Sequence, residues 1–138
     1  MSAQTKTKTR QKKNNQTASS IVWFEIAADN VERAKSFYSA LFGWKINQFP
    51  GDKGYWHIDT GGGEDTPDGG LMARCHPQQA ITNYVNVDSV DDAMAKVEKL
   101  GGKVCSPKMP VPGRGYFAMC VDTEKNNFAL WEMNSSAK

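Results

Sequence analysis

The chain has 138 residues, a length that suits one compact domain, and 39% of them are hydrophobic, enough to form a buried core. Charged residues make up 23% and the formal net charge is +2, which are ordinary values for a water-soluble protein. The first 20 residues contain five basic residues and no acid, a charge of +5, which leaves −3 for residues 21–138. This pattern is unlike a nucleic-acid-binding domain, and no stretch approaches the roughly 20 apolar residues of a membrane span.

Residues 1–20 are rich in Ser, Thr, Gln, Asn and Lys, so we expect a disordered basic tail without the apolar segment of a secretory signal. The chain has three widely spaced cysteines, Cys75, Cys105 and Cys120. Their odd number and spacing favour free thiols in a reducing compartment, and we predict a cytoplasmic protein. The domain is predicted at residues 21–134, with a short C-terminal tail at residues 135–138.

An internal repeat with an offset of 59 residues is the most informative feature of the sequence. Residues 21–46 and 81–105 each contain a strand-like run, a short acidic turn, a helical pattern, a glycine and a second strand-like run. The offset aligns Gly43 with Gly102, at the ends of the two helical patterns. A long period with only two copies indicates a duplicated module rather than a solenoid.

The first copy follows the order β-α-β-β-β. Its helix is predicted to begin at Asp29, with Glu32 completing a capping box, and to end at Gly43. The apolar face of this helix is predicted to consist of Val31, Ala34, Tyr38 and Leu41. The strands that follow this helix are predicted at residues 44–49, 55–59 and about 70–75.

The second copy repeats this order after a helix that begins at Ser89 and ends at Gly101 and Gly102. The apolar face of the second helix is predicted to consist of Val90, Ala93, Val97 and Leu100. The later strands are predicted at residues 103–105, 116–121 and 128–133. The sequence therefore predicts an α+β fold of two βαβββ modules, about residues 21–76 and 81–134, with helices on one face of curved sheets. The other face is free to line a cavity.

These residues resemble the vicinal oxygen chelate superfamily, also called the glyoxalase/bleomycin-resistance/dioxygenase superfamily. The resemblance covers about residues 21–134, in the segments WFEIAADNVERAKSFYSALFGWKI, YVNVDSVDDAMAKVEKLGGKV and PVPGRGYFAMCVDTEKNNFALWE. It implies that the two modules form a cup. Metal-dependent members hold a divalent ion in this cup with His and Glu side chains from four strands, and the ion can bind an oxygenated substrate.

The resemblance also gives the residues that stand at the four ligand positions of this chain. They are Trp23, residues 70–72, Thr82 and Ala129. None of these side chains is a useful ligand for a divalent ion. The resemblance therefore implies that the metal site is missing, and we predict no metal and no cofactor.

The period-two alternation of strands predicts which side chains face the cup. If Trp23 points inward then so does Glu25, and the same reasoning selects alternate residues on the strands that contain Thr82 and Ala129. The predicted ligand pocket consists of Trp23, Glu25, His57, Thr82, Tyr84 and Trp131. This mixture of aromatic rings and a few polar groups suits a small organic ligand. In the alternative interpretation, the aromatic rings fill the interior in place of the metal.

The first functional hypothesis is a metal-independent small-molecule-binding protein of the glyoxalase/bleomycin-resistance type, whose ligand the sequence does not identify. The alternative is a lyase, isomerase or dioxygenase that acts on a small oxygenated metabolite, with Glu25 or His57 as the candidate catalytic group. A third hypothesis is an interaction module guided by the basic tail. The resemblance implies a homodimer, and no nucleic-acid or membrane partner is expected.

Overall fold

The computed structural model describes residues 18–138, so most of the predicted basic tail lies outside the described residues. The first module contains β1 (Ile21–Ala28), α1 (Val31–Phe42), β2 (Lys45–Phe49), β3 (Asp52–Asp59) and β4 (Asp68–Ala73). The second contains β5 (Thr82–Asn86), α2 (Val90–Lys99), β6 (Lys103–Val104), β7 (Met109–Val111), β8 (Gly115–Val121) and β9 (Asn127–Met133). Both modules follow the predicted order, and the second gains one short strand, β7.

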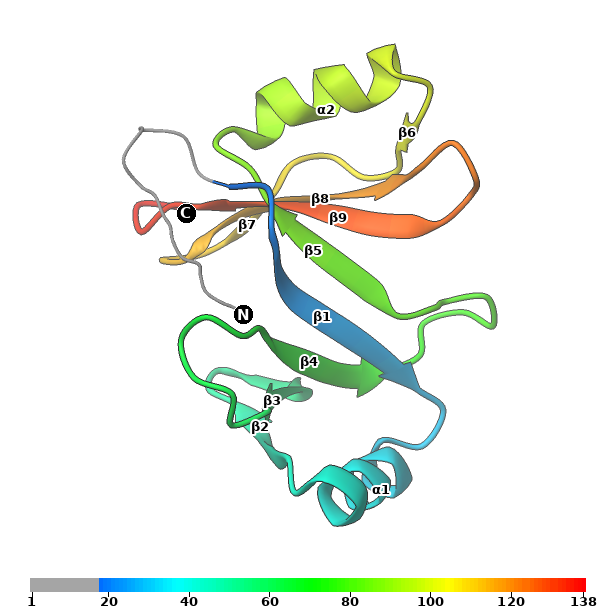
Figure 1. Ribbon diagram of the computed structural model, residues 1–138, viewed down its shortest axis with the longest axis vertical. Helices are drawn as coiled ribbons and strands as arrows, with labels where there is room; N and C mark the ends of the chain where they lie inside the picture. Colours follow the sequence, from blue (N-terminus) through cyan, green and yellow to red (C-terminus); the bar gives the residue numbers. More distant parts are fainter. Residues whose placement is uncertain (1–17) are drawn as a thin grey trace, which may run out of the picture.

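The strands form one curled sheet in the order β2-β3-β4-β1-β5-β9-β8-β6, and β7 pairs with β8. Within each half the first and last long strands are parallel, β1 with β4 and β5 with β9, while β1 and β5 join the halves as an antiparallel pair. The two helices lie outside the curve of the sheet (Figure 1). The predicted α+β fold is confirmed, and we call the side of the sheet opposite the helices the inner face.

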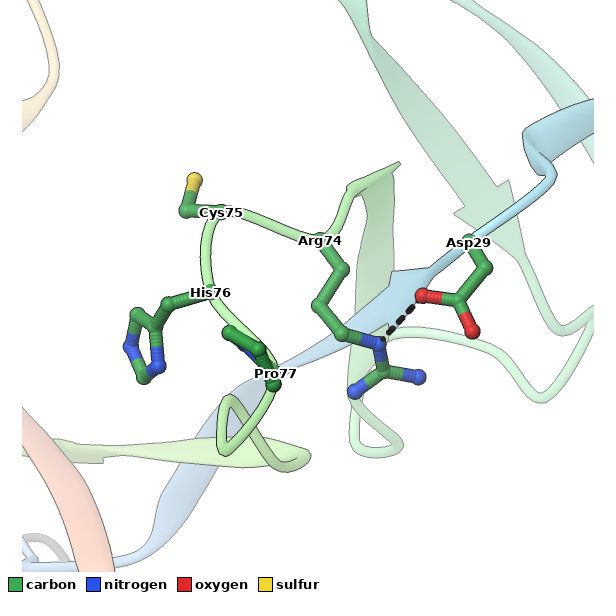
Figure 2. A pocket seen from close by; sticks show the side chains of 5 residues that line it. All are labelled: Asp29, Arg74, Cys75, His76 and Pro77. Atoms are coloured by element: carbon green, nitrogen blue, oxygen red, sulfur yellow. Dashed lines mark hydrogen bonds and ion pairs between the residues drawn. The ribbon is translucent and has the colours of Figure 1, made fainter.

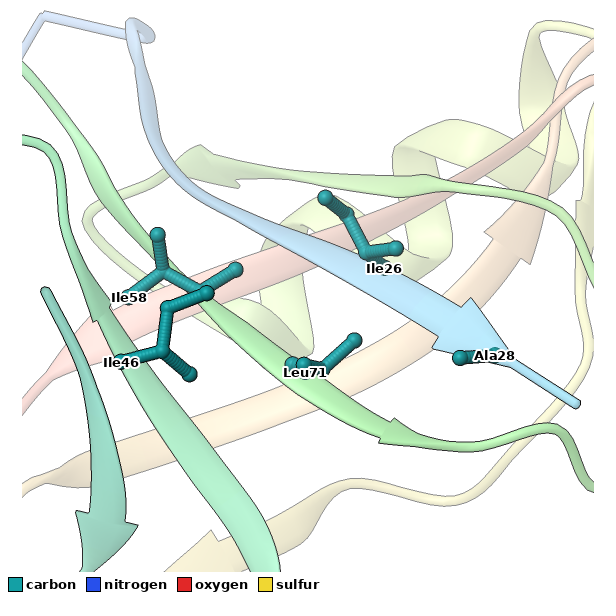
Figure 3. Packing of buried hydrophobic residues seen from close by; sticks show 5 residues of the cluster. All are labelled: Ile26, Ala28, Ile46, Ile58 and Leu71. Carbon is teal, nitrogen blue, oxygen red and sulfur yellow. The ribbon is translucent and has the colours of Figure 1, made fainter. Parts of the chain in front are cut away.

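Two apolar cores hold the helices against the sheet, one in each module. The first core lies under α1 and consists of Ile26, Ala28, Ile46, Ile58 and Leu71 (Figure 3). The second lies under α2 and consists of Val90, Ala118, Cys120 and Leu130. Burial of each large aliphatic side chain contributes about 1.5–3 kcal/mol. Because Ile26 and Ala28 face α1, their neighbours at odd positions along β1 face the inner side.

The start of α1 differs from the prediction by one residue. The side chain of Asn30, not Asp29, accepts a hydrogen bond from the backbone N–H of Arg33 at 2.9 Å, so the prediction of Asp29 as the cap is wrong. The Asp29 carboxylate instead lies 2.9 Å from Nε of Arg74, a residue 45 positions along the chain. Asp and Asn are both good caps, and here Asn30 takes that position while Asp29 pairs with Arg74.

The other helix ends follow the sequence. Ser89 accepts a hydrogen bond from the backbone of Asp92 at 3.1 Å, and Gly43 ends α1 in the left-handed region with φ of 73°. The predicted apolar faces are wrong at their last positions, because Leu41 and Leu100 are 58% and 68% exposed. Both leucines stand at the C-terminal ends of their helices, Leu41 in the last turn of α1 and Leu100 at the C-cap of α2.

Strand β7 lies in a segment that the sequence predicts as a loop. Pro110 cannot donate a backbone hydrogen bond, but it stands opposite Tyr116 on an outer strand, where a proline is tolerated. The chain end packs nearby, since Ala137 is 5% exposed and its carbonyl accepts a hydrogen bond from Gly113 at 2.9 Å. Among the residues that the structure describes, no helix is long and apolar enough to cross a membrane.

Candidate functional site

The central antiparallel pair of strands places the predicted pocket residues side by side on the inner face. Trp23 of β1 stands opposite Tyr84 of β5, and Glu25 stands opposite Thr82. Thr82 and Tyr84 are only 3% and 8% exposed. The alternation that buries Ile26 against α1 therefore directs these four side chains to the other side of the sheet.

Glu25 is the centre of a hydrogen-bonded group that includes Tyr55, a residue that the sequence analysis did not select. The Tyr55 hydroxyl donates to Oε2 of Glu25 at 2.7 Å, and the Tyr84 hydroxyl donates to Oε1 at 3.1 Å. The indole Nε1 of Trp23 donates to the Tyr55 hydroxyl at 2.8 Å. We call Trp23, Glu25, Tyr55 and Tyr84 the Glu25 cluster.

The electrostatics of the Glu25 cluster keep both phenols protonated. Burial, and then the neighbouring Glu25 carboxylate, raise the pKa of the Tyr55 phenol above its usual range. The same two causes, in the same order, raise the pKa of the Tyr84 phenol. Each hydroxyl therefore remains a donor to the carboxylate at any physiological pH.

The internal repeat explains why Glu25 and Tyr84 meet. They are separated by 59 residues, which is the offset of the repeat, so they occupy equivalent positions in the two modules. Their strands are the antiparallel pair that joins the two halves of the sheet. Equivalent positions near such a junction lie close together, and here they carry a carboxylate and its hydrogen-bond donor.

His57 of β3 forms a second polar group beside the Glu25 cluster. Its ring stacks on the indole of Trp23, with centroids 5.6 Å apart and planes 12° apart. Its Nε2 lies 3.1 Å from Oδ2 of Asp68, and the two side chains are 39% and 32% exposed, so solvent reaches them. The other carboxylate oxygen of Asp68 accepts hydrogen bonds from the backbone N–H and the hydroxyl of Thr60 at 3.0 and 3.2 Å.

Phe49, at the end of β2, connects this region to the C-terminal module. Its ring meets the rings of Tyr55 and His57 edge-on, with centroids 5.6 and 6.4 Å away. The guanidinium carbon of Arg114, between β7 and β8, lies 4.9 Å from the centroid of Phe49. Strands β2 and β7 belong to opposite ends of the sheet, so this cation–π contact joins the two modules across the inner face.

The C-terminal module contributes mainly rings and small residues to the inner face. Phe117 of β8 lies 6.1 Å from Tyr84, centroid to centroid. Trp131, the sixth predicted residue, lies on β9 two positions beyond Ala129, which stands opposite Tyr84. Its indole packs against Gly115, where a Cβ would lie 2.7 Å from the ring. Trp131 is therefore on the predicted face but further along it than the other five.

The residues at the four family ligand positions do not fit a divalent metal ion. Gly70 and Ala129 are separated by the same 59 residues as Trp23 and Thr82, so the four positions form two equivalent pairs. A Cβ on Gly70 would lie 1.9 Å from the Tyr55 hydroxyl, so the phenol fills the space that a ligand side chain would need. Within residues 18–138, no group of three or more His, Cys, Asp or Glu side chains could hold a metal.

A surface depression lies elsewhere, near the end of β4. It is lined by Asp29, Arg74, Cys75, His76 and Pro77 (Figure 2). The Arg74 guanidinium is committed to structural contacts there, with the Asp29 carboxylate and with the backbone carbonyls of Gln79 and Ala27. None of the six predicted pocket residues lines it.

Tyr55 could have been predicted from the sequence as a residue of this face. Tyr55 is two positions before His57 on β3, so the alternation that selects His57 also selects Tyr55. Asp68 and Phe49 had no such signal. Asp68 lies two residues before the strand predicted from residue 70, and it is the first residue of β4.

Comparisons with known proteins indicate the family of this chain. The family described as bleomycin resistance protein-like N-terminal matches residues 20–61. A glyoxylase-like domain-containing protein of Didymella fabae is 34% identical over 114 residues, which cover 77% of this chain and 88% of that protein. The putative glyoxylase CFP32 of Mycobacterium bovis is 31% identical over 117 residues, 81% of this chain but 45% of that protein, so this chain spans about half its length.

A solved structure supports the same assignment of fold. A glyoxalase/bleomycin resistance protein/dioxygenase superfamily member from Vibrio splendidus superposes with a TM-score of 0.60 at 11% identity, over 85% of this chain and 100% of that chain. At this identity the likeness concerns the fold alone, whereas the relative from Didymella fabae extends it to the sequence. The chain therefore belongs to the glyoxalase/bleomycin resistance/dioxygenase superfamily.

Proposed function

We propose that the protein binds a small organic molecule on the inner face of the sheet, without a metal ion. Aromatic rings with a few polar groups are the usual lining of sites for such molecules. The inner face has this composition, with the rings of Trp23, Phe49, Tyr84 and Phe117 around the Glu25 carboxylate. Membership of a glyoxalase-like family also supports a role in small-molecule binding.

The observation that carries the proposal is the position of the Tyr55 hydroxyl. It lies over Gly70, where a family ligand would stand, and it is held there by Trp23 and Glu25. A divalent ion needs deprotonated or lone-pair donors such as imidazole and carboxylate. The indole N–H and the protonated phenol are hydrogen-bond donors, so the space is filled by an internal hydrogen-bond network in place of ligands.

Metal analysis and native mass spectrometry of protein purified from its own host, without chelators, test the proposal. We expect less than a tenth of an equivalent of any transition metal by elemental analysis, and a retained organic molecule in the native spectrum. Dialysis against manganese, iron, nickel or zinc salts should leave the melting temperature unchanged, because a metal that bound the folded state would raise it. One equivalent of a metal ion per chain would contradict the proposal.

An enzymatic function is the second candidate, and the His57–Asp68 pair is the observation that favours it. A carboxylate 3.1 Å from one ring nitrogen can orient an imidazole for proton transfer, and the pair is open to solvent. Relatives described as glyoxylases support a lyase or isomerase acting on a small oxygenated metabolite. Loss of turnover in His57→Ala, with Glu25→Ala as a second variant, is the expected result, and unchanged turnover in both would remove this candidate.

We also propose a homodimer in the cytoplasm. The three cysteines are free thiols, which fits a reducing compartment. Phe37, Leu41 and Phe42 are exposed apolar side chains on α1, an observation consistent with an interface between copies. Light scattering with size-exclusion chromatography should give twice the mass of 15.3 kDa, and a mass of one chain at micromolar concentration would contradict the dimer.

A further inference from the structure

The geometry points to a cationic ligand: we propose that the molecule bound on the inner face carries a protonated amine or amidine, which pairs with Glu25, on a flat aromatic body. This inference rests on the proposed binding function and specifies the chemistry of its ligand. It follows from three properties of the inner face, namely the direction of the hydrogen-bond donors, the unbalanced charge and the arrangement of the rings.

The phenol and indole donors of the Glu25 cluster are already used within the protein. The hydroxyls of Tyr55 and Tyr84 both donate to the carboxylate, and the indole N–H of Trp23 donates to the Tyr55 oxygen. The carboxylate has about four acceptor positions, and these bonds occupy two. The Glu25 carboxylate can therefore accept about two more hydrogen bonds, and a ligand can supply these only with N–H or O–H donors.

Within the part of the chain that the structure describes, no cation pairs with Glu25. Glu25 is half-buried, and it makes no salt bridge with any Lys, Arg or His among residues 18–138. Asp68 adds a second carboxylate to the same face, beside His57. An anionic ligand would be repelled by both acids, whereas a cation would supply the missing partner of a partly desolvated charge.

Arg114, a basic residue that reaches this face, does not fill that role. Arg114 is held over the ring of Phe49, with its guanidinium carbon 4.9 Å from the centroid, and it forms no ion pair with Glu25 or Asp68 among the described residues. It therefore lies at the margin of the site and leaves Glu25 available to a ligand.

The aromatic rings fit the two parts of such a ligand. Rings that surround a carboxylate stabilise a cation through their negative faces, and they also pack on an apolar body. The Glu25 cluster brings three rings to the carboxylate, and Phe49 and Phe117 extend this surface to both modules. A cation at Glu25 with an aromatic body on these rings would contact both the carboxylate and the rings around it.

Isothermal titration calorimetry with a matched series of probes tests the inference on the full chain. The probes are naphthylmethylammonium, naphthylmethanol and naphthoate, which share one ring system and differ in charge. We expect the ammonium to bind at least about tenfold more tightly than the alcohol, as hydrogen bonds to charged groups allow, and the naphthoate to bind most weakly. The preference should decrease with added salt.

Two variants assign the preference to Glu25. Glu25→Gln keeps the size of the side chain and an acceptor for a phenol but removes the charge, so the ammonium should bind no better than the alcohol. Glu32→Gln removes the same charge from an exposed position on α1, and it should keep the preference of the natural chain. Circular dichroism and a thermal melt show whether each variant is folded, and an unfolded Glu25→Gln is replaced by Glu25→Met in the same comparison.

The outcomes separate this inference from the proposed function. Equal or tighter binding of the alcohol or the naphthoate would overturn the cationic ligand while leaving small-molecule binding intact. A preference for the ammonium that survives Glu25→Gln would also overturn it, because another group would then be responsible. Absence of binding by all three probes would contradict both proposals.

Discussion

The N-terminal and C-terminal halves of the sheet have the same strand order but present different side chains to the inner face. The N-terminal half supplies the carboxylate of Glu25, which the phenol of Tyr55 contacts at 2.7 Å, and separately the His57–Asp68 pair, whose atoms lie 3.1 Å apart. The C-terminal half supplies the Tyr84 hydroxyl, which reaches across to Glu25, and beyond it mainly rings and small residues. The two copies share one topology, while most of the hydrogen-bonded polar side chains of the inner face belong to the first copy.

Gly70 and Ala129 occupy equivalent positions in the two halves, but only the second has room for a methyl group. Ala129 carries its Cβ in a fully buried site, with 0% exposure. A Cβ on Gly70 would instead lie 1.9 Å from the Tyr55 hydroxyl and 2.2 Å from Cζ of the same ring. The glycine is needed in the N-terminal half because Tyr55 occupies that space, and this requirement can be broken by mutation.

The largest expected effect is that of Gly70→Ala. The new methyl group must displace the Tyr55 ring and with it the bonds to Trp23 and Glu25. Overpacking of this kind costs about 1–3 kcal/mol, and loss of the hydrogen bonds adds to it, so we expect the free energy of unfolding to fall by about 3 kcal/mol. Urea unfolding followed by circular dichroism measures the change.

Gly54→Ala is the matched control for this variant. Gly54 is exposed on β3, and a Cβ there would meet an Asp52 carboxylate oxygen at 3.8 Å, an ordinary van der Waals contact, so the change in stability should stay within about 0.5 kcal/mol. If Tyr55 is the cause, Gly70→Ala should cost much less in a Tyr55→Ala background. Equal costs in the two backgrounds would contradict the role of the phenol.

The two phenols of the Glu25 cluster, one from each half of the sheet, should contribute differently to the free energy of unfolding. Tyr55→Phe removes a donor 2.7 Å from Glu25 and leaves the Trp23 N–H without its acceptor, so we expect a loss of about 2–3 kcal/mol. Tyr84→Phe removes one bond of 3.1 Å, and we expect a loss of about 1 kcal/mol. Chemical unfolding of both variants measures the difference.

Tyr116→Phe is the control for these variants, because the Tyr116 ring lies by Lys108, outside the Glu25 cluster. Its free energy of unfolding should stay within about 0.5 kcal/mol of the natural chain. Equal losses for Tyr55→Phe and Tyr84→Phe would show that the two modules contribute alike, contrary to the difference between the halves of the sheet.

The raised pKa values of the same phenols predict a loss of stability in alkali. The ordinary phenol pKa is 10.0, and both folded values lie above it. Below pH 10.0 both states hold the protons and the full stability is present; above it the unfolded chain releases protons that the folded chain retains, so stability falls as pH rises. Each phenol should lower the free energy of unfolding by about 1.4 kcal/mol per pH unit in this range.

Denaturant unfolding at several pH values between 9 and about 11.5 measures this slope. Tyr84→Phe should remove the contribution of one phenol, and Tyr55→Phe that of the other. A slope that is the same in the natural chain and in both variants would assign the alkaline loss to other groups.

The repeat in the sequence was sufficient to predict the fold and the orientation of most of the site. The 59-residue offset aligned the two modules, and alternation along β1 and β5 correctly directed Trp23, Glu25, Thr82 and Tyr84 to one face. These features depend on local periodicity and on the burial of one face, which a sequence displays directly. Whether these residues bind a ligand stays a prediction.

The remaining details depend on contacts between distant segments. Tyr55 reaches Glu25 across 30 residues because Gly70 leaves room for its ring, and no local pattern encodes that space. Asp29 pairs with Arg74, which is 45 residues further along the chain, and does not cap the helix. The prolines around β7 conceal a strand that only its pairing with β8 reveals. Each of these features involves a contact between segments that are distant in the sequence, which local sequence patterns do not indicate.

The smallest expected effect concerns the contact that joins the two halves, between Arg114 and Phe49. An exposed cation–π pair contributes about 0.5–1 kcal/mol, so Arg114→Ala should lower the free energy of unfolding by about 0.5 kcal/mol. A double-mutant cycle with Phe49→Leu isolates the pair from other effects of each change, and it should give a coupling of similar size. Arg114→Lys keeps the charge and should retain part of the coupling, since an ammonium also binds to a ring face. A coupling of zero would contradict a contribution of this contact to joining the two modules.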